Sequence, residues 1–173
     1  SAAQHCFRPV LDVWGNTSLP GILVAGDAGG IAGARAAAAA GHLAAAEALR
    51  HLGRLDAPGR DRLAAPDRRA YAKALKARGF LDALYPPPEA IRRPADDVIV
   101  CRCEEVTAGQ LRHVARQGCQ GPNQAKAFLR AGMGPCQGRL CGPVVSDLLA
   151  QTLDRSVAEV GYYRVRPPLK PIT

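Results

Sequence analysis

The most regular hydrophobic pattern lies near the start of the chain. The run Gly-Ile-Leu-Val-Ala-Gly at residues 21–26 contains no charged or polar side chain, and Asp27 follows it directly. An apolar run that ends in Gly-Asp predicts a buried strand stopping at a tight turn. Gly29 and Gly30 then form a Gly-rich turn, and the alanine-rich stretch that follows, to about Leu52, predicts a helix that Gly53 ends.

The segment from residue 55 to about residue 94 predicts a basic helical connection. Pro66 and Asp67 are typical of a helix start, and the expected helix runs to Leu84 before the prolines at 86–88 stop it. Nine of the 23 lysines and arginines lie in this segment. A nucleic-acid surface is one interpretation of this charge, but no aromatic residues alternate with it, so we favour a solvated helical hairpin.

The last part of the chain predicts a short extended piece and four helices. The extended piece covers residues 98–103. Thr107 and Gln110 have the spacing of a capping box, which predicts a helix from Thr107 to Gln117. The other three helices are expected to begin near polar or proline-containing starts, at Asn123 to Arg130, Cys141 to Leu153, and Ser156 to Val160.

Composition and charge narrow the class of protein. The chain has 173 residues, 32 alanines, 18 glycines and a formal charge of +8, and 47% of its residues are hydrophobic. This apolar content excludes disorder for most of the chain and predicts a core of small side chains. The sequence shows neither a signal peptide nor an uninterrupted apolar span, so we expect no stable membrane insertion and a reducing, cytoplasmic location.

Four cysteines form two closely spaced pairs. One residue separates Cys101 from Cys103, four separate Cys136 from Cys141, and 32 lie between the pairs. On an extended backbone Cys101 and Cys103 point to the same side, so each pair could hold one iron. Structural zinc usually uses two pairs spaced by two residues, so this spacing favours an iron–sulfur cluster, with zinc, free thiols or a disulfide as alternatives.

The neighbours of these cysteines suit a negatively charged cluster. Arg102 and Arg139 could offset its charge. Backbone amides could donate to the sulfurs from Gly134, Gln137, Gly138 and Gly142. Cys119 has no partner and is expected to be a small buried residue.

The two cysteine motifs resemble a known family. Residues 101–106 and 132–141 resemble the bacterioferritin-associated-ferredoxin-like [2Fe-2S] domain, in the form found at the C-terminus of FAD-dependent amino-acid and opine dehydrogenases of the opine oxidase and hydrogen cyanide synthase type. Residues 161–163 and 164–168 resemble the tail of that group. The resemblance implies a small all-helical domain with the cluster near one end. The simplest ferredoxins of the family have two residues within the second pair, so the four found here favour the dehydrogenase branch.

A second resemblance lies in residues 17–27, which are similar to the second flavin fingerprint of two-dinucleotide-binding flavoproteins. It implies that Asp27 hydrogen-bonds the ribityl chain of FAD and that its neighbours line the flavin approach, namely Gly26, Gly29, Gly30 and Ile31. An ordinary tight turn is the alternative. The chain has no G-x-G-x-x-G motif for the ADP half of FAD, so we expect only a partial FAD site.

Together these features predict a mainly α fold with three parts: residues 1–54 as a strand-turn-helix remnant of an α/β flavin-binding domain, 55–95 as a basic helical linker, and 96–173 as the [2Fe-2S] domain. We expect the electron-transfer portion of an FAD-dependent oxidoreductase that oxidises an amino acid, imino acid or opine. No catalytic residue is visible, so the chain is not expected to be catalytically complete. Its expected partners are the rest of the flavoprotein, sister subunits and an electron acceptor, but no nucleic acid. A zinc module that docks a partner, or a regulatory ferredoxin acting without flavin, are the alternatives.

Overall fold

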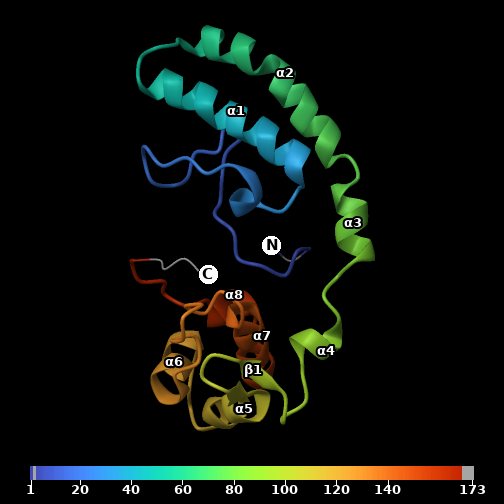
Figure 1. The fold of residues 1–173 in the computed structure, drawn as a ribbon, viewed down its shortest axis with the longest axis vertical. Helices are drawn as coiled ribbons and strands as arrows, with labels where there is room; N and C mark the ends of the chain where they lie inside the picture. Colours follow the sequence, from blue (N-terminus) through green and yellow to red (C-terminus); the bar gives the residue numbers. More distant parts are fainter. Residues whose placement is uncertain (2, 169–173) are drawn as a thin grey trace. The chain divides into compact units, whose positions relative to one another are not determined.

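The structure is a computed structural model that describes residues 1 and 3–168. It divides the chain into two compact units, Ser1–Pro86 and a second that begins at Pro87. Helices dominate both units (Figure 1), and the described residues contain one sheet of two short strands. The predicted mainly α class is therefore confirmed.

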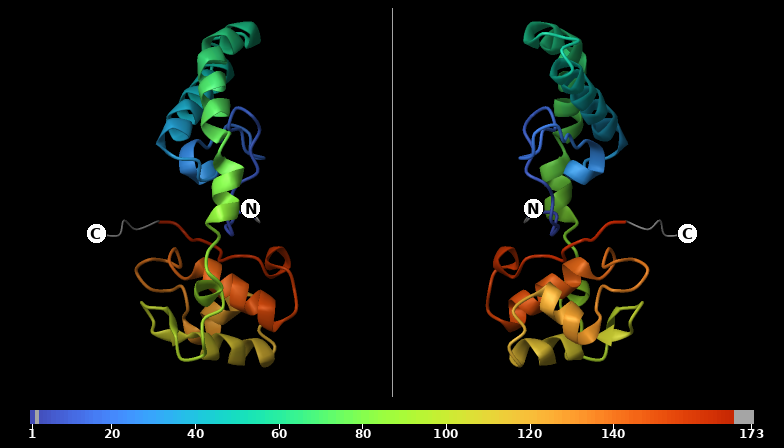
Figure 2. Two further views of the ribbon diagram at one scale, coloured as in Figure 1. Left: turned by 90° about the vertical axis from the view of Figure 1, so that its right-hand side faces the viewer. Right: turned by 90° about the vertical axis from the view of Figure 1, so that its left-hand side faces the viewer.

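The first unit is built on a pair of long helices. After the short 3-10 helix η1 (Gly26–Gly29), helix α1 (Ala34–His51) packs against α2 (Ala57–Leu75), and α3 (Arg78–Leu84) follows. The views of Figure 2 show α1 and α2 side by side. The core between them is small, as the composition predicts, and consists of Trp14, Leu43, Ala46, Ala64 and the partly buried Tyr71.

The strand predicted at residues 21–26 is wrong. The structure has only an isolated bridge between Asn16 and Leu23 there, and the Val24 amide donates to the Gly15 carbonyl at 2.8 Å. A strand needs a neighbour to satisfy its backbone groups. In the described part of the chain this run has no sheet beside it, so it folds back on the residues that precede it.

The helix predicted to begin at Pro66 begins nine residues earlier, at Ala57. The Asp56 carboxylate accepts a hydrogen bond from the Gly59 amide at 2.7 Å and caps α2, while Pro66 lies inside that helix. An interior proline removes one helical hydrogen bond, but its φ is compatible with a helix. The favourable cap therefore decides where the helix starts, and the expected helix is divided between α2 and α3.

A buried carboxylate ties the amino-terminal segment to the hairpin. The Glu47 side chain is 2% exposed and accepts hydrogen bonds from Arg50 at 2.7 Å and from Arg60 at 2.6 Å. The Trp14 ring also contacts two guanidinium groups, with its centroid 3.8 Å from Arg60 Cζ and 4.2 Å from Arg68 Cζ. The hydrogen bonds from Arg50 and Arg60 favour the ionised form of Glu47, so the pKa of this carboxyl group lies well below the usual value.

The second unit surrounds one small sheet with short helices. Its elements are α4 (Glu89–Arg92), β1 (Ile99–Cys101), β2 (Val106–Thr107), α5 (Ala108–Arg116), α6 (Pro122–Leu129), α7 (Gly142–Thr152) and α8 (Val157–Val160). The strands are antiparallel, with Cys101 opposite Val106. The largest fully buried side chains come from α5 and α7, namely Leu111, Val145, Leu148 and Leu149.

The four predicted helices of this unit are present. Thr107 and Ser156 form the capping boxes of α5 and α8. Asn123 is not a cap, because α6 begins at Pro122; its side chain instead donates to the Tyr162 carbonyl at 3.1 Å and accepts from the Arg164 amide at 2.9 Å. Asn123 therefore anchors the segment that follows α8.

The two units divide at Pro86–Pro87, whereas the sequence predicts boundaries after residues 54 and 95. The helices of the predicted linker, α2 and α3, belong to the first unit, and the three-part division stays a prediction. Within the described residues, no helix combines the length and the apolar character needed to cross a membrane.

Candidate metal centre

The four paired cysteines come from two loops of the second unit. Cys101 ends β1 and Cys103 lies in the turn before β2. Cys136 and Cys141 lie in the loop between α6 and α7, and Cys141 is the residue before α7. Three of the four are buried, whereas Cys103 is exposed.

The fold brings one cysteine of each pair together. The Cys103 thiol lies 3.8 Å from the Cys136 sulfur, although the sequence places them in different pairs. Cys101 and Cys141 also interact, since Cys101 contributes to the pKa of Cys141 through charge and a side-chain hydrogen bond. These sulfur contacts thus run between the two loops rather than within each sequence pair.

A cavity of about 220 Å³ opens between these loops. It is lined by Val100, Cys101, Arg102, Cys103, Cys136, Leu140 and Cys141. All four paired cysteines therefore face one space. Arg102 also lines this cavity, which is where a residue must lie to offset the negative charge of a cluster.

The donor set fits a two-iron cluster. Two thiolates bound to one tetrahedral metal at about 2.3 Å are separated by about 3.8 Å, which agrees with the separation of the Cys103 and Cys136 sulfurs. The described residues, these four cysteines included, contain no group of three or more Cys, His, Asp or Glu side chains arranged around a single ion. Two neighbouring sulfur pairs at one cavity are the arrangement that two irons need.

The environment of Cys136 favours its thiolate. Burial raises the pKa of this thiol, but hydrogen bonds from backbone amides and from the Cys103 thiol lower it more, so the net pKa is below the usual value. The amides belong to Leu140, Gly138 and Arg139. The loop that follows Cys136 therefore folds its backbone donors around the sulfur, which also suits a metal-bound thiolate.

The environment of Cys141 instead favours the protonated thiol. Burial, followed by the nearby charge of Cys101, raises the pKa of its thiol to about 12. Its proton must leave before a metal can bind, so metal loading and proton release are coupled at this position.

Glycines allow the loops to approach each other closely. A Cβ atom at Gly134 would lie 2.0 Å from Cys103 Cβ. At Gly132 and Gly138 it would meet the Tyr163 ring at 2.7 and 2.8 Å, and at Gly142 it would meet the Tyr162 hydroxyl at 2.1 Å. These two tyrosines were not predicted as parts of the site, although the Gly-Tyr-Tyr segment was among the resembling motifs.

The predicted sulfur donors are confirmed in part. The Gly138 amide donates to Cys136, but the amides of Gln137 and Gly142 donate to carbonyl groups instead. A donor that was not predicted from the sequence is the Gly132 amide, which lies 3.5 Å from the Cys101 sulfur.

Two further predicted residues have defined places. The Arg139 guanidinium donates to the Cys136 carbonyl at 2.9 Å. Cys119 is buried in the core, as predicted, and its thiol lies 3.4 Å from the Gly121 carbonyl oxygen.

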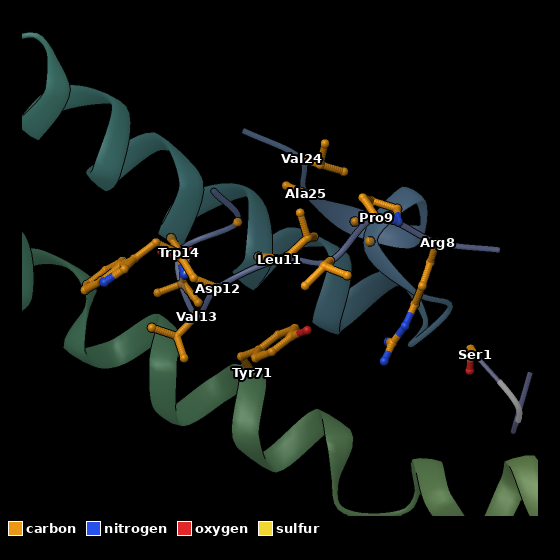
Figure 3. A pocket seen from close by; sticks show the side chains of 16 residues that line it. Ser1, Arg8, Pro9, Leu11, Asp12, Val13, Trp14, Val24, Ala25 and Tyr71 are labelled. Carbon is orange, nitrogen blue, oxygen red and sulfur yellow. Dashed lines mark hydrogen bonds between the residues drawn. The ribbon is translucent and has the colours of Figure 1, made fainter. Parts of the chain in front are cut away.

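The predicted flavin residues lie in the first unit. Gly26 and Gly29 line a pocket of about 430 Å³, drawn in Figure 3 with Arg8, Leu11 and Tyr71 around it. Asp27 accepts a hydrogen bond from the Ala32 amide at 3.4 Å. Gly30 and Ile31 follow η1, and Gln4 hydrogen-bonds both backbone groups of Ile31.

Arg8 is a residue of this pocket that was not predicted from the sequence. Its guanidinium lies against Gly30, where a Cβ would be 2.9 Å from Nη1. A cation beside a glycine-rich turn is a chemically suitable neighbour for an anionic group. No motif in the sequence marks Arg8.

Part of the second unit is similar to a known family. Residues 99–151 match the family model of the BFD-like [2Fe-2S] binding domain. The match covers part of the second unit and about a third of the chain. The matched BFD-like segment includes all four paired cysteines and spans β1 through most of α7.

The whole chain is similar to parts of longer proteins. It is 50% identical to an opine oxidase subunit of Rhizobium meliloti over 100% of the chain and 37% of the relative, and 47% identical to the corresponding subunit of Agrobacterium tumefaciens over 98% and 34%. It is 35% identical to the HcnB subunit of hydrogen cyanide synthase of Pseudomonas protegens over 95% and 35%. The chain thus spans about a third of the length of these relatives. No solved structure matches it.

Proposed function

We propose that the chain is the electron-transfer part of an oxidoreductase, in which Cys101, Cys103, Cys136 and Cys141 hold a [2Fe-2S] cluster. Such a cluster, when bound, takes up and releases one electron at a time. The observation that carries the proposal is the convergence of all four cysteines on one cavity. The match of residues 99–151 to a [2Fe-2S] binding family supports the same assignment.

The surrounding residues have separate tasks in this proposal. The backbone of residues 138–140 directs amides at the Cys136 sulfur and stabilises its negative charge. The Gly132 amide does the same for Cys101. Burial of Cys101, Cys136 and Cys141 keeps bulk water away from most of the cluster ligands. Hydrogen bonds and exclusion of water both set the potential at which the site accepts an electron.

Electrons would enter or leave on the exposed side of the site. Cys103 is exposed, and the neighbouring Leu140 is 72% exposed although it is apolar. Leu140 and Cys103 line the same cavity, so a partner that covers Leu140 also approaches the cysteine sulfur. An apolar contact next to an accessible ligand suits a redox partner that binds and releases.

For the complete enzyme, we propose oxidation of an amino acid, imino acid or opine. The C–N group of the substrate would lose two electrons and two protons to FAD. The electrons would then pass one at a time through the cluster to an external electron acceptor. The relatives named as subunits of opine oxidase and hydrogen cyanide synthase support this proposal. Residues outside this chain would supply the substrate site and most of the FAD site, and Gly26, Asp27 and Gly29–Ile31 the remainder.

The test is an anaerobic redox titration of the 173-residue chain after reconstitution with iron and sulfide. We expect the chain to take up one electron from dithionite and to return it to a one-electron oxidant, with the visible absorption bleaching and recovering. A Cys136→Ala variant treated in parallel controls for iron bound elsewhere. A loaded chain that takes up no electron, or a variant that behaves like the unaltered chain, would overturn the proposal.

A further inference from the structure

A buried phenol lies against the cysteine loops. The Tyr163 side chain, which follows α8, is 6% exposed. Its ring fills the space in front of Gly132 and Gly138, and a Cβ at Gly132 would be 3.0 Å from the Tyr163 hydroxyl oxygen. The ring therefore lies against the loop that carries the second cysteine pair, at the end of the domain where the sulfurs converge.

The hydroxyl of this phenol lacks a partner of normal hydrogen-bonding geometry among the described residues. Leaving a buried hydroxyl unpaired costs about 1–3 kcal/mol, so such groups are rare and call for a ligand or another function. The sulfurs are close by. Tyr163 packs in the same buried core as Cys101 and Cys141. After burial, the charge of Cys141 and a side-chain hydrogen bond with it are the main causes that raise the pKa of Tyr163.

A cation strengthens this phenol as a donor. The Lys126 ammonium on α6 lies 5.9 Å from the centroid of the Tyr163 ring, within the range of a cation–π interaction. A positive charge over the ring withdraws electron density and makes the hydroxyl a better hydrogen-bond donor. Tyr162 offers a contrast, because its hydroxyl is 3.4 Å from the Gly138 carbonyl oxygen.

We propose that the Tyr163 hydroxyl donates a hydrogen bond to the Cys141 sulfur of the loaded site and thereby raises its reduction potential. The inference rests on the proposed function, because it needs a cluster on the four cysteines. Added negative charge spreads onto the cysteine sulfurs when the site is reduced. A donor to one of them therefore stabilises the reduced form more than the oxidised form.

The test compares Tyr163→Phe with Tyr162→Phe in the reconstituted 173-residue chain. Each variant removes one hydroxyl and keeps the ring, but only Tyr163 has its hydroxyl unpaired. We expect Tyr163→Phe to lower the equilibrium constant for one-electron reduction about tenfold, which is a fall of about 59 mV. Tyr162→Phe should stay near the unaltered value. An unchanged potential in Tyr163→Phe, or equal falls in both variants, would overturn the inference.

A second measurement tests the inference if the Tyr163→Phe variant does not bind the cluster. In the Tyr162→Phe background, Tyr163 is the last tyrosine of the second unit, and the other two, Tyr71 and Tyr85, lie in the first. Replacing tyrosine by 3-fluorotyrosine there makes the phenol a stronger donor. We expect the potential to rise, and an unchanged or lower potential contradicts the inference. If the unaltered chain binds no cluster, the proposed function itself fails, whereas a loaded chain with unshifted potentials removes only the role of Tyr163.

Discussion

The Cys103 and Cys136 sulfurs lie 3.8 Å apart although the residues are 33 positions apart in the sequence. The contact joins the turn between β1 and β2 to the loop before α7. Both loops depend on the helical core for their positions, because Cys101 and Cys141 belong to it together with Leu111 and Leu148. The metal site is therefore a product of the tertiary fold rather than of one local motif.

Replacing a paired cysteine should abolish cluster assembly, whereas replacing the unpaired buried one should not. We expect Cys136→Ala to lose the visible absorption of the reconstituted chain. Cys119→Ala should keep it and lose only about 1 kcal/mol of unfolding free energy. Acid-labile sulfide assays on both variants check this. Loss of the cluster in Cys119→Ala but not in Cys136→Ala would contradict the ligand assignment.

The close approach at Gly134 predicts sensitivity to a single methyl group. In Gly134→Ala the new Cβ would lie 2.0 Å from Cys103 Cβ, so the loops must separate and the Cys103 sulfur must move away from Cys136. We expect a large loss of bound iron and sulfide per chain. Gly79→Ala in α3 is the matched control, since nothing lies within 4 Å of its new Cβ. The control should retain full loading and gain about 0.5–1 kcal/mol of stability.

Glu47 predicts how the first unit responds to acid. Hydrogen bonds from Arg50, opposed by burial and joined by those from Arg60 and Asn16, lower the pKa of Glu47 from 4.5 in the folded state. The stabilisation is complete above pH 4.5 and is lost as the pH falls toward the lower folded pKa. Urea unfolding followed by the fluorescence of Trp14, the single tryptophan, measures this dependence.

The Glu47→Gln variant is the control for that titration. It removes the charge from a buried ion pair and should cost about 3 kcal/mol at neutral pH. It should also flatten the loss of stability below pH 4.5. A variant with the same acid dependence as the unaltered chain would show that other carboxylates cause it.

The chain alone should bind FAD weakly. Only Gly26 and Gly29 of the predicted flavin residues line the pocket of the first unit, and residues 21–26 form no strand beside it. We expect FAD to separate from the chain during gel filtration. Retention of one FAD per chain would contradict the view that residues outside this chain supply most of the site.

Local signals predicted the helices of the second unit well. The capping boxes at Thr107 and Ser156 and the proline after Gly142 fix helix starts through contacts within one turn. Local signals gave a wrong strand at residues 21–26, because a strand also needs a neighbouring strand to pair with. Pro66 predicted the wrong helix start for a related reason, because the Asp56 side chain caps the helix at an earlier position.

The cysteine set was predictable from spacing, but its surroundings were not. The contact of Cys103 with Cys136 and the position of Tyr163 both depend on how α6, α7 and the segment after α8 pack. Tyr163 is 22 residues beyond Cys141, so no short motif links the phenol to the sulfur.

The central claim is that the four paired cysteines hold a [2Fe-2S] cluster. Its most direct test is quantitative analysis of iron, acid-labile sulfide and zinc in the anaerobically purified chain, with the visible spectrum of the same sample. The account predicts two irons and two sulfides per chain and broad visible bands that dithionite bleaches. A colourless chain that holds one zinc, even after iron–sulfur reconstitution, would contradict it.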